Sequence, residues 1–299
     1  MKKLKIIMMD GFKSSYLKHA PYLSSLTEKN QYGKLEMPPG HWGGVEMVFR
    51  GKSNILAVFY KGKKKLLFLR NFRFLGGFGK LGRMIVDMLV NFPRFVKGYE
   101  LFKTGSIPLN RLYRFDIAIN NHFGKRKDID YVYFGELDSF AHKYGIKSKE
   151  FIKLIKKIDR EVSKLDFDII LSDHGMVDIE ENVKVPWSRD CFIDGDMARY
   201  WGGEEELKEI KNKLPLDKGK LLDWKDKRFG QLIFLANTGI LIYPNFWDKK
   251  PSKAMHGYDG KHEEMKAFYL LNEKGKKKDL KAEELHEIFK RKLYDFRNL

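Results

Sequence analysis

The chain has 299 residues, of which 43% are hydrophobic and 33% charged, so it can bury a large core and is not disordered throughout. Its single cysteine, Cys191, excludes an internal disulfide framework and a zinc site built on paired cysteines. Lysine and arginine outnumber aspartate and glutamate by 58 to 40, and the net charge of +18 favours anionic partners: phosphorylated molecules, nucleic acid or anionic lipid.

The amino terminus begins with lysines and an apolar run, as a secretory signal does. The run covers only Ile6 to Met9 and stops at an acid, which is too short for a signal core. No uncharged stretch approaches the roughly 20 residues needed to cross a bilayer. We therefore expect a cytoplasmic protein, with peripheral membrane contact as an open alternative.

Short apolar runs alternate with helical periodicity along the chain. The expected strands lie at 5–9, 55–60, 65–69, 129–137, 167–172, 231–236, 239–243 and 265–271, and the expected helices at 16–29, 149–165 and 282–294. This alternation predicts a single α/β domain over 1–299, with a mostly parallel central sheet and helices on both faces. In such sheets, ligands bind at the carboxyl ends of the strands.

Two insertions into this domain are expected, a basic aromatic cap at about 61–127 and a small polar cap at about 177–230. Within the first, residues 61–103 carry eleven Lys or Arg, two acids and eight Phe or Tyr. Three interpretations stay open for this segment: a lid whose aromatic residues fill a core, a contact with anionic lipid, or a site for single-stranded nucleic acid.

Carboxylates and imidazoles recur in four short segments, most of them directly after an expected strand. They are Asp10, the pair Asp138 and His142, the pair Asp173 and His174, and His256. Residues four apart share one face of a helix, so Asp138 and His142 could bind one ion. Each segment alone is typical of a turn or an exposed pair, but their conjunction in a chain with eight histidines favours a metal site. The ligand types suit zinc, or manganese or iron.

These motifs give the sequence a resemblance to a known family. From residue 5 to about 270 it resembles the alkaline phosphatase superfamily, in the branch of type I phosphodiesterases and nucleotide pyrophosphatases. The motifs that carry the resemblance are Asp10-Gly11, Asp138-x-x-x-His142, Ser172-Asp173-His174-Gly175-Met176 and His256-Gly257-Tyr258.

The resemblance implies an alkaline phosphatase-like fold and two divalent metal ions, zinc or alternatively manganese or iron. One ion would be held by Asp138, His142 and His256, and the other by Asp10, Asp173, His174 and the nucleophile. The implied activity is hydrolysis or transfer at a phosphate ester, a diester rather than a monoester, on a small molecule or on a phosphorylated polymer or lipid precursor. Arg199 could contact the substrate phosphate or form a structural salt bridge.

The sequence departs from the family at the nucleophile. The family places a Ser or Thr at the start of a helix, which here falls near 41–43, yet no Ser or Thr lies between Tyr32 and Lys52. Three explanations stay open: water activated by the metal ions attacks phosphorus, His41 serves as nucleophile or ligand, or the protein is a catalytically silent relative that binds metal and a phosphorylated ligand. A basic nucleic-acid-binding protein is a further alternative. We favour a working enzyme.

Overall fold

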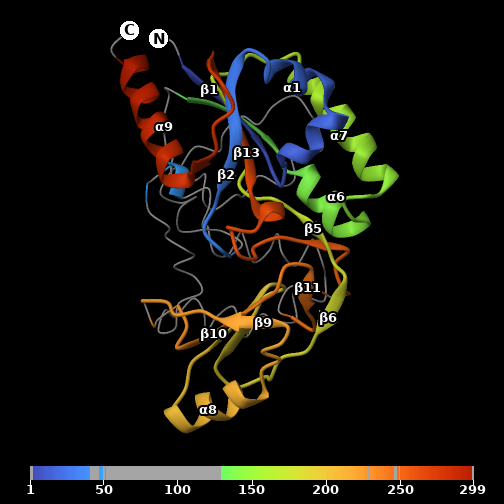
Figure 1. The fold of residues 1–299 in the computed structure, drawn as a ribbon, viewed down its shortest axis with the longest axis vertical. Helices are drawn as coiled ribbons and strands as arrows, with labels where there is room; N and C mark the ends of the chain where they lie inside the picture. The colour runs from blue at the N-terminus through green and yellow to red at the C-terminus, as the bar shows by residue number, and fades with distance from the viewer. Residues whose placement is uncertain are drawn as a thin grey trace, which may run out of the picture.

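The computed structural model describes residues 3–40, 47–49, 51, 129–225, 227, 229–245, 248 and 250–297. Three predictions lie outside the described residues: the role of His41, the strands at 55–60 and 65–69, and the basic cap at 61–127. Figure 1 shows the described part as a helix-covered sheet in the upper half and a smaller, mainly β lobe below it.

The upper half is organised around one mixed sheet. Its strand order is β14-β2-β13-β4-β1-β3. The strands are β1 (Leu4–Met9), β2 (Asn30–Glu36), β3 (Ile129–Phe134), β4 (Ile169–Leu171), β13 (Ala267–Lys274) and β14 (Leu280–Lys281). β1 pairs in parallel with both β3 and β4, whereas β13 runs antiparallel to β4 and β2. The parallel trio of β1, β3 and β4 therefore ends at one edge of the sheet.

Helices cover both faces of this sheet. Helix α9 (Ala282–Arg297) packs on one face, and α1 (Pro21–Leu26), α6 (Glu136–Tyr144) and α7 (Lys149–Val162) pack on the other (Figure 1). Successive side chains of β13 point to opposite faces of the sheet. Tyr269 belongs to the apolar cluster under α9, and Phe268 belongs to the apolar cluster on the other face. The predicted α/β class, with helices on both faces of a central sheet, is confirmed.

The lower lobe has a sheet and an apolar cluster of its own. Strands β7 (Cys191–Ile193), β8 (Met197–Tyr200), β10 (Leu232–Ala236) and β9 (Gly219–Leu221) form an antiparallel sheet, and α8 (Glu204–Lys213) lies at the bottom of Figure 1. Two short pairs complete the lobe: β6 (Glu181–Val183) with β11 (Ile240–Ile242), and β5 (Val177–Asp178) with β12 (Ala254–Met255). The lower lobe therefore contains the segment expected as a small polar cap at 177–230 together with the strands β10, β11 and β12 that follow it.

Several elements differ from the sequence expectation. The strand expected at 129–137 ends at Phe134, and Glu136 and Leu137 begin helix α6. The helix predicted at 16–29 is divided into a 3-10 helix at Ser14–His19 and α1, which begins at Pro21. Proline lacks the N–H that would continue the first helix, and its fixed φ suits the first position of a new one. Strand β2 was not expected, because its polar residues and Gly33 do not form an apolar run.

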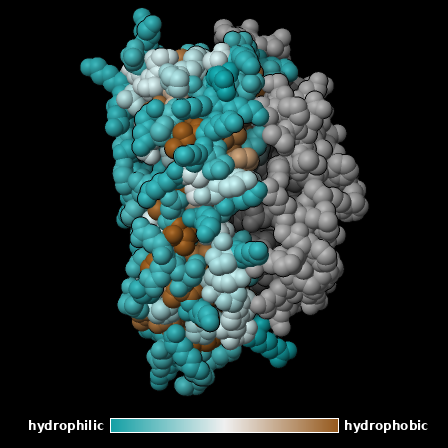
Figure 2. Space-filling view, turned by 90° about the vertical axis from the view of Figure 1, so that its right-hand side faces the viewer, coloured by the Kyte–Doolittle hydropathy of each residue, from teal (hydrophilic) through white to brown (hydrophobic). Residues whose placement is uncertain are grey.

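On the face that Figure 2 shows, the described residues are mostly hydrophilic, with small scattered apolar spots and no large apolar area among them. The most exposed large hydrophobic side chains among the described residues are Tyr144, Trp187, Leu216 and Tyr294. Within the described ranges, no helix combines the length and the apolar character that spanning a membrane requires.

Candidate metal centre

The parallel strands bring two of the predicted segments together. Asp10 follows β1 directly, and Asp173 stands two residues after β4, so both lie at the carboxyl edge of the sheet. A hydrogen bond joins the two turns, since Gly11 N donates to Asp173 Oδ1 at 3.2 Å. Asp10 N also donates to the carbonyl of Phe134 at the end of β3, at 3.1 Å. The ends of all three strands are thus bound to one another.

Helix α6 supplies the third segment. It begins at Glu136, directly after the turn residue Gly135, and its i,i+4 spacing puts His142 Nε2 3.0 Å from Asp138 Oδ1. His142 Nδ1 lies 2.7 Å from the carbonyl oxygen of Ala254. Because a carbonyl only accepts, Nδ1 carries a proton, and Nε2 is the ring atom that faces Asp138.

His256 reaches the centre from the lower lobe, directly after β12. Its ring stacks on His174 with 3.5 Å between centroids and 2° between planes, and its Nε2 lies 3.4 Å from Asp138 Oδ1. The next residue, Gly257, has φ +92°, and a Cβ there would lie 2.6 Å from Asp196 Oδ2. Only glycine meets both conditions, so the turn that aims His256 depends on this residue.

His174 stands in the middle of the group. Its Nε2 lies 3.2 Å from Asp10 Oδ1 and 3.4 Å from Asp173 Oδ2. Its Nδ1 lies 2.8 Å from the carbonyl oxygen of Gly175, which fixes the ring in the same way as that of His142. Gly11, at φ +73°, leaves room for this ring, because a Cβ there would already contact His174 Cε1 at 3.4 Å.

Together these contacts define two groups of potential ligands. One contains Asp10, Asp173 and His174, the other contains Asp138, His174 and His256, and within each group the ligand atoms lie within 4.8 Å of one another. His174 belongs to both groups, and His142 joins the second through Asp138. The structure therefore brings all six predicted ligands into one pocket. Their metal-binding role stays a prediction.

The electrostatics of the pocket show the cost of crowding carboxylates without cations. Burial, together with Asp173 and Asp138, raises the pKa of Asp10 to about 7. Burial lowers the pKa of His174, but Asp173, Asp10 and Asp138 outweigh it and raise that pKa to about 10. Burial raises the pKa of Asp138, yet His142 and His256 bring it well below its ordinary value. A protonated His174 therefore helps to balance the carboxylates around it.

This donor set fits divalent metal ions. Carboxylate oxygens with imidazole nitrogens form typical zinc and manganese sites, and the two imidazoles held by backbone carbonyls have the support that metal-ligating histidines usually receive. Asp10 and His256 are also largely buried, at 9% and 6% exposure. A divalent cation would replace the imidazolium protons in balancing the carboxylates.

Two residues at this centre were not anticipated from the sequence. The hydroxyl of Tyr133, near the end of β3, donates to Asp10 Oδ2. The ammonium of Lys13, only 5% exposed, donates to the carbonyl of Met176 at 2.7 Å and forms an ion pair with Glu264. Lys13 follows Asp10-Gly11 closely, which was an available signal, whereas nothing in the sequence pairs Tyr133 with Asp10.

Arg199, predicted to contact substrate, lies on β8 and is 3% exposed. Its guanidinium lies over the rings of Phe229 and Phe192, at 4.3 and 5.0 Å from their centroids. These contacts stabilise the lower lobe, and a contact with substrate stays a prediction. The role of His41 also stays a prediction, since that residue is outside the described ranges.

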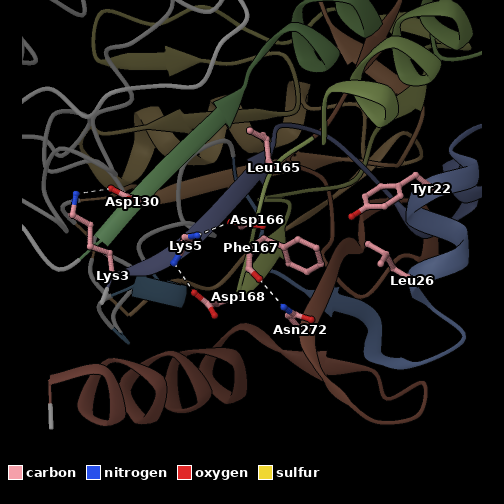
Figure 3. Close-up of a pocket in the computed structure, with 10 residues that line it drawn as sticks. All are labelled: Lys3, Lys5, Tyr22, Leu26, Asp130, Leu165, Asp166, Phe167, Asp168 and Asn272. Carbon is pink, nitrogen blue, oxygen red and sulfur yellow. Dashed lines mark hydrogen bonds and ion pairs between the residues drawn. The ribbon is translucent and has the colours of Figure 1, made fainter. Parts of the chain in front are cut away.

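A groove of about 640 Å³ lies at the opposite, amino-terminal end of the same strands (Figure 3). Its charged residues form ion pairs across the sheet: Lys3 with Asp130 at 2.9 Å and Lys5 with Asp166 at 2.8 Å. None of the six predicted ligands lines this groove.

Comparisons with known proteins agree with the motifs and the fold. The profile of the family described as "Type I phosphodiesterase / nucleotide pyrophosphatase" matches residues 97–218. Human ectonucleotide pyrophosphatase/phosphodiesterase family member 7 is 26% identical over 181 residues, which are 48% of this chain and 40% of that protein. The chain thus matches less than half the length of this relative.

Solved structures extend the likeness to nearly the whole chain. Human ectonucleotide pyrophosphatase/phosphodiesterase 5 superposes with a TM-score of 0.68 at 15% identity, covering 98% of this chain and 95% of that one. The murine protein, as an inactive variant in complex with AMP, gives a TM-score of 0.66 at 16% identity with the same coverage. At this identity the likeness establishes the fold.

Proposed function

We propose that this chain is a member of the type I phosphodiesterase/nucleotide pyrophosphatase-like branch of the alkaline phosphatase superfamily, whose profile matches residues 97–218. We propose further that it hydrolyses or transfers phosphodiesters at the centre that contains Asp10 and His256. The observation that carries the proposal is the convergence of three carboxylates and three imidazoles from four separate segments. Its substrate class is a phosphate diester on a small molecule or on a phosphorylated precursor.

We propose that the centre holds two divalent ions, zinc in the first instance. Asp10, Asp173 and His174 would hold one, and Asp138, His256 and His142 the other. Ions so placed would neutralise the phosphoryl oxygens and stabilise the charge that develops during displacement at phosphorus. The chain itself orients the ligands: backbone carbonyls fix His142 and His174, and Gly257 aims His256.

The test is turnover of bis(p-nitrophenyl) phosphate together with metal content. We expect wild-type protein reconstituted with Zn²⁺ to bind two ions and to release nitrophenol, and Asp173→Ala and His256→Ala to abolish the release. The matched control is Asp166→Ala, which removes a carboxylate that lies in the groove at the other end of the sheet. A metal-loaded wild type without turnover on a panel of diesters contradicts the catalytic proposal.

A second candidate function is a catalytically silent relative that binds metal and a phosphorylated ligand. The observation that favours it is the lack of Ser and Thr between Tyr32 and Lys52, where the family carries its nucleophile. This candidate predicts two bound ions and saturable binding of a nucleotide without its breakdown. His41→Ala separates the routes to activity, because loss of turnover with metal content unchanged would assign the attack to that side chain.

A further inference from the structure

We infer that Tyr133 is a positioning residue, whose hydroxyl holds the Asp10 carboxylate so that its other oxygen faces the metal centre. The inference rests on the proposed function, since it concerns how that centre is built. The hydroxyl of Tyr133 donates to Asp10 Oδ2, while Asp10 Oδ1 lies 3.2 Å from His174 Nε2. The two oxygens of this carboxylate thus have different partners.

The different partners of the two Asp10 oxygens matter because a carboxylate directly after a strand can rotate about its side-chain torsions. A hydrogen bond to one oxygen removes that freedom and directs the other oxygen toward the ion, as partners of metal-ligating side chains commonly do. Asp138 has His142 beside it, one helical turn later on α6. Asp10 has no such neighbour, because the chain turns at Gly11. Tyr133 therefore supplies from β3 an orientation that the turn itself does not.

The surroundings of Tyr133 hold its ring in this position. Its side chain is 8% exposed, and its ring stacks on Tyr131, with centroids 6.5 Å apart and planes inclined by 16°. On the other side, the ring crosses Gly135, where a Cβ would lie 2.7 Å from Tyr133 Cε1 and 3.0 Å from its hydroxyl oxygen. Gly135 has φ −85°, which any residue adopts, so the reason for glycine here is space for the ring.

The contact between Tyr133 and Asp10 follows from the parallel pairing of β1 and β3. β1 and β3 are parallel neighbours in which Met9 is opposite Phe134. The residue after β1 and the penultimate residue of β3 therefore meet at one edge of the sheet. A phenol is long enough to cross from one strand end to the ligand that follows the other. Tyr133 and Gly135 then act as a pair, one providing the hydrogen bond and the other the room for it.

The experiment measures Zn²⁺ binding to the metal-free protein by calorimetry or chelator competition, without any substrate. We expect two sites in the wild type. In Tyr133→Phe, which keeps the ring and removes the hydroxyl, the affinity of one site falls roughly 10–100-fold and the other is unchanged. The visible spectrum of the Co²⁺-loaded protein changes for that one site. Tyr131→Phe makes the same chemical change on the same face of β3 and leaves both affinities as in the wild type.

A second variant tests the same geometry from the other side. Gly135→Ala keeps the hydroxyl but displaces the ring, and we expect it to weaken the same site as Tyr133→Phe. Denaturation of the metal-free variants checks that each is folded. Two wild-type affinities in a folded Tyr133→Phe protein overturn the inference and leave the proposed function intact. A folded wild type that binds no Zn²⁺ overturns both.

Discussion

The charged side chains are arranged differently at the two ends of the parallel strands. At the amino-terminal end, the groove of Figure 3 pairs Lys3 with Asp130 and Lys5 with Asp166, and these side chains are 42–86% exposed. At the carboxyl end, carboxylates of Asp10, Asp138 and Asp173 are crowded in a mostly buried pocket. An exposed pair of opposite charges is neutral by itself, whereas carboxylates crowded in a buried site need positive charge or protons nearby. This contrast supports the proposal that the carboxyl end is the functional end, without reference to any relative.

The largest effect is expected when one carboxylate is removed on each side of the sheet: Asp138, in the helix that follows β3, or Asp130, near the start of β3. We expect Asp138→Asn to lower diester turnover by about three orders of magnitude, because the loss of a ligand removes several kcal/mol of transition-state stabilisation. Asp130→Asn, at the opposite end of the strand, leaves turnover unchanged. Steady-state kinetics with Zn²⁺-loaded proteins measure both, and equal losses in the two variants contradict the assignment of the functional end.

One lysine near each end of the parallel strands, Lys5 or Lys13, allows the same comparison to be made by measuring stability. Lys13→Met removes a buried ammonium that contacts Met176 and Glu264, and we expect a loss of about 2 kcal/mol in the free energy of unfolding, since its partners lose a charge-assisted donor. Urea denaturation of the metal-free protein provides the measurement. If the urea midpoint of Lys13→Met equals that of the wild type, the Lys13 ammonium does not stabilise the contact between the turn after β1 and the turn after β4.

The pH dependence of the metal-free protein reports on the crowded carboxylates and His174 at the carboxyl end of the strands. The pKa of His174 rises from 6.5 when unfolded to about 10 when folded, because the nearby carboxylates outweigh its burial. The proton on His174 therefore stabilises the fold fully below pH 6.5, and that stability is lost as the pH rises through about 10. We expect the melting temperature to fall between pH 7 and 10, and His174→Gln to remove this fall. A flat profile in the wild type contradicts the charge balance described for the pocket.

The smallest effect is expected at the exposed end. Lys5→Met breaks the pair with Asp166, and we expect no measurable change in the urea midpoint or in Zn²⁺ content, because solvent screens an exposed ion pair. Lys5 and Lys13 stand in and just after the same strand, so burial is the main difference between the two variants. Similar losses in both would remove the contrast.

Part of the site was predictable from local sequence. Asp10 and Asp173 follow apolar runs that had to be buried strands, and the spacing of Asp138 and His142 placed them on one helical face. The helix over 16–29 was wrong at Pro21, although the residue itself carries that signal. Strand β2 was missed because it takes its place through pairing with β13 and β14 rather than through an apolar pattern.

Residue chemistry and periodicities within a few residues were enough to predict the residue types proposed as ligands, the strand ends that carry several of them and the α/β class. Three contacts could be seen in the folded chain alone: His256 stacks on His174, His174 belongs to both groups of potential ligands, and Tyr133 donates to Asp10. Most of those contacts join residues far apart in the chain, up to the 164 positions between Asp10 and His174. Their geometry follows from the register of the parallel strands and the docking of the lower lobe, which no local pattern encodes.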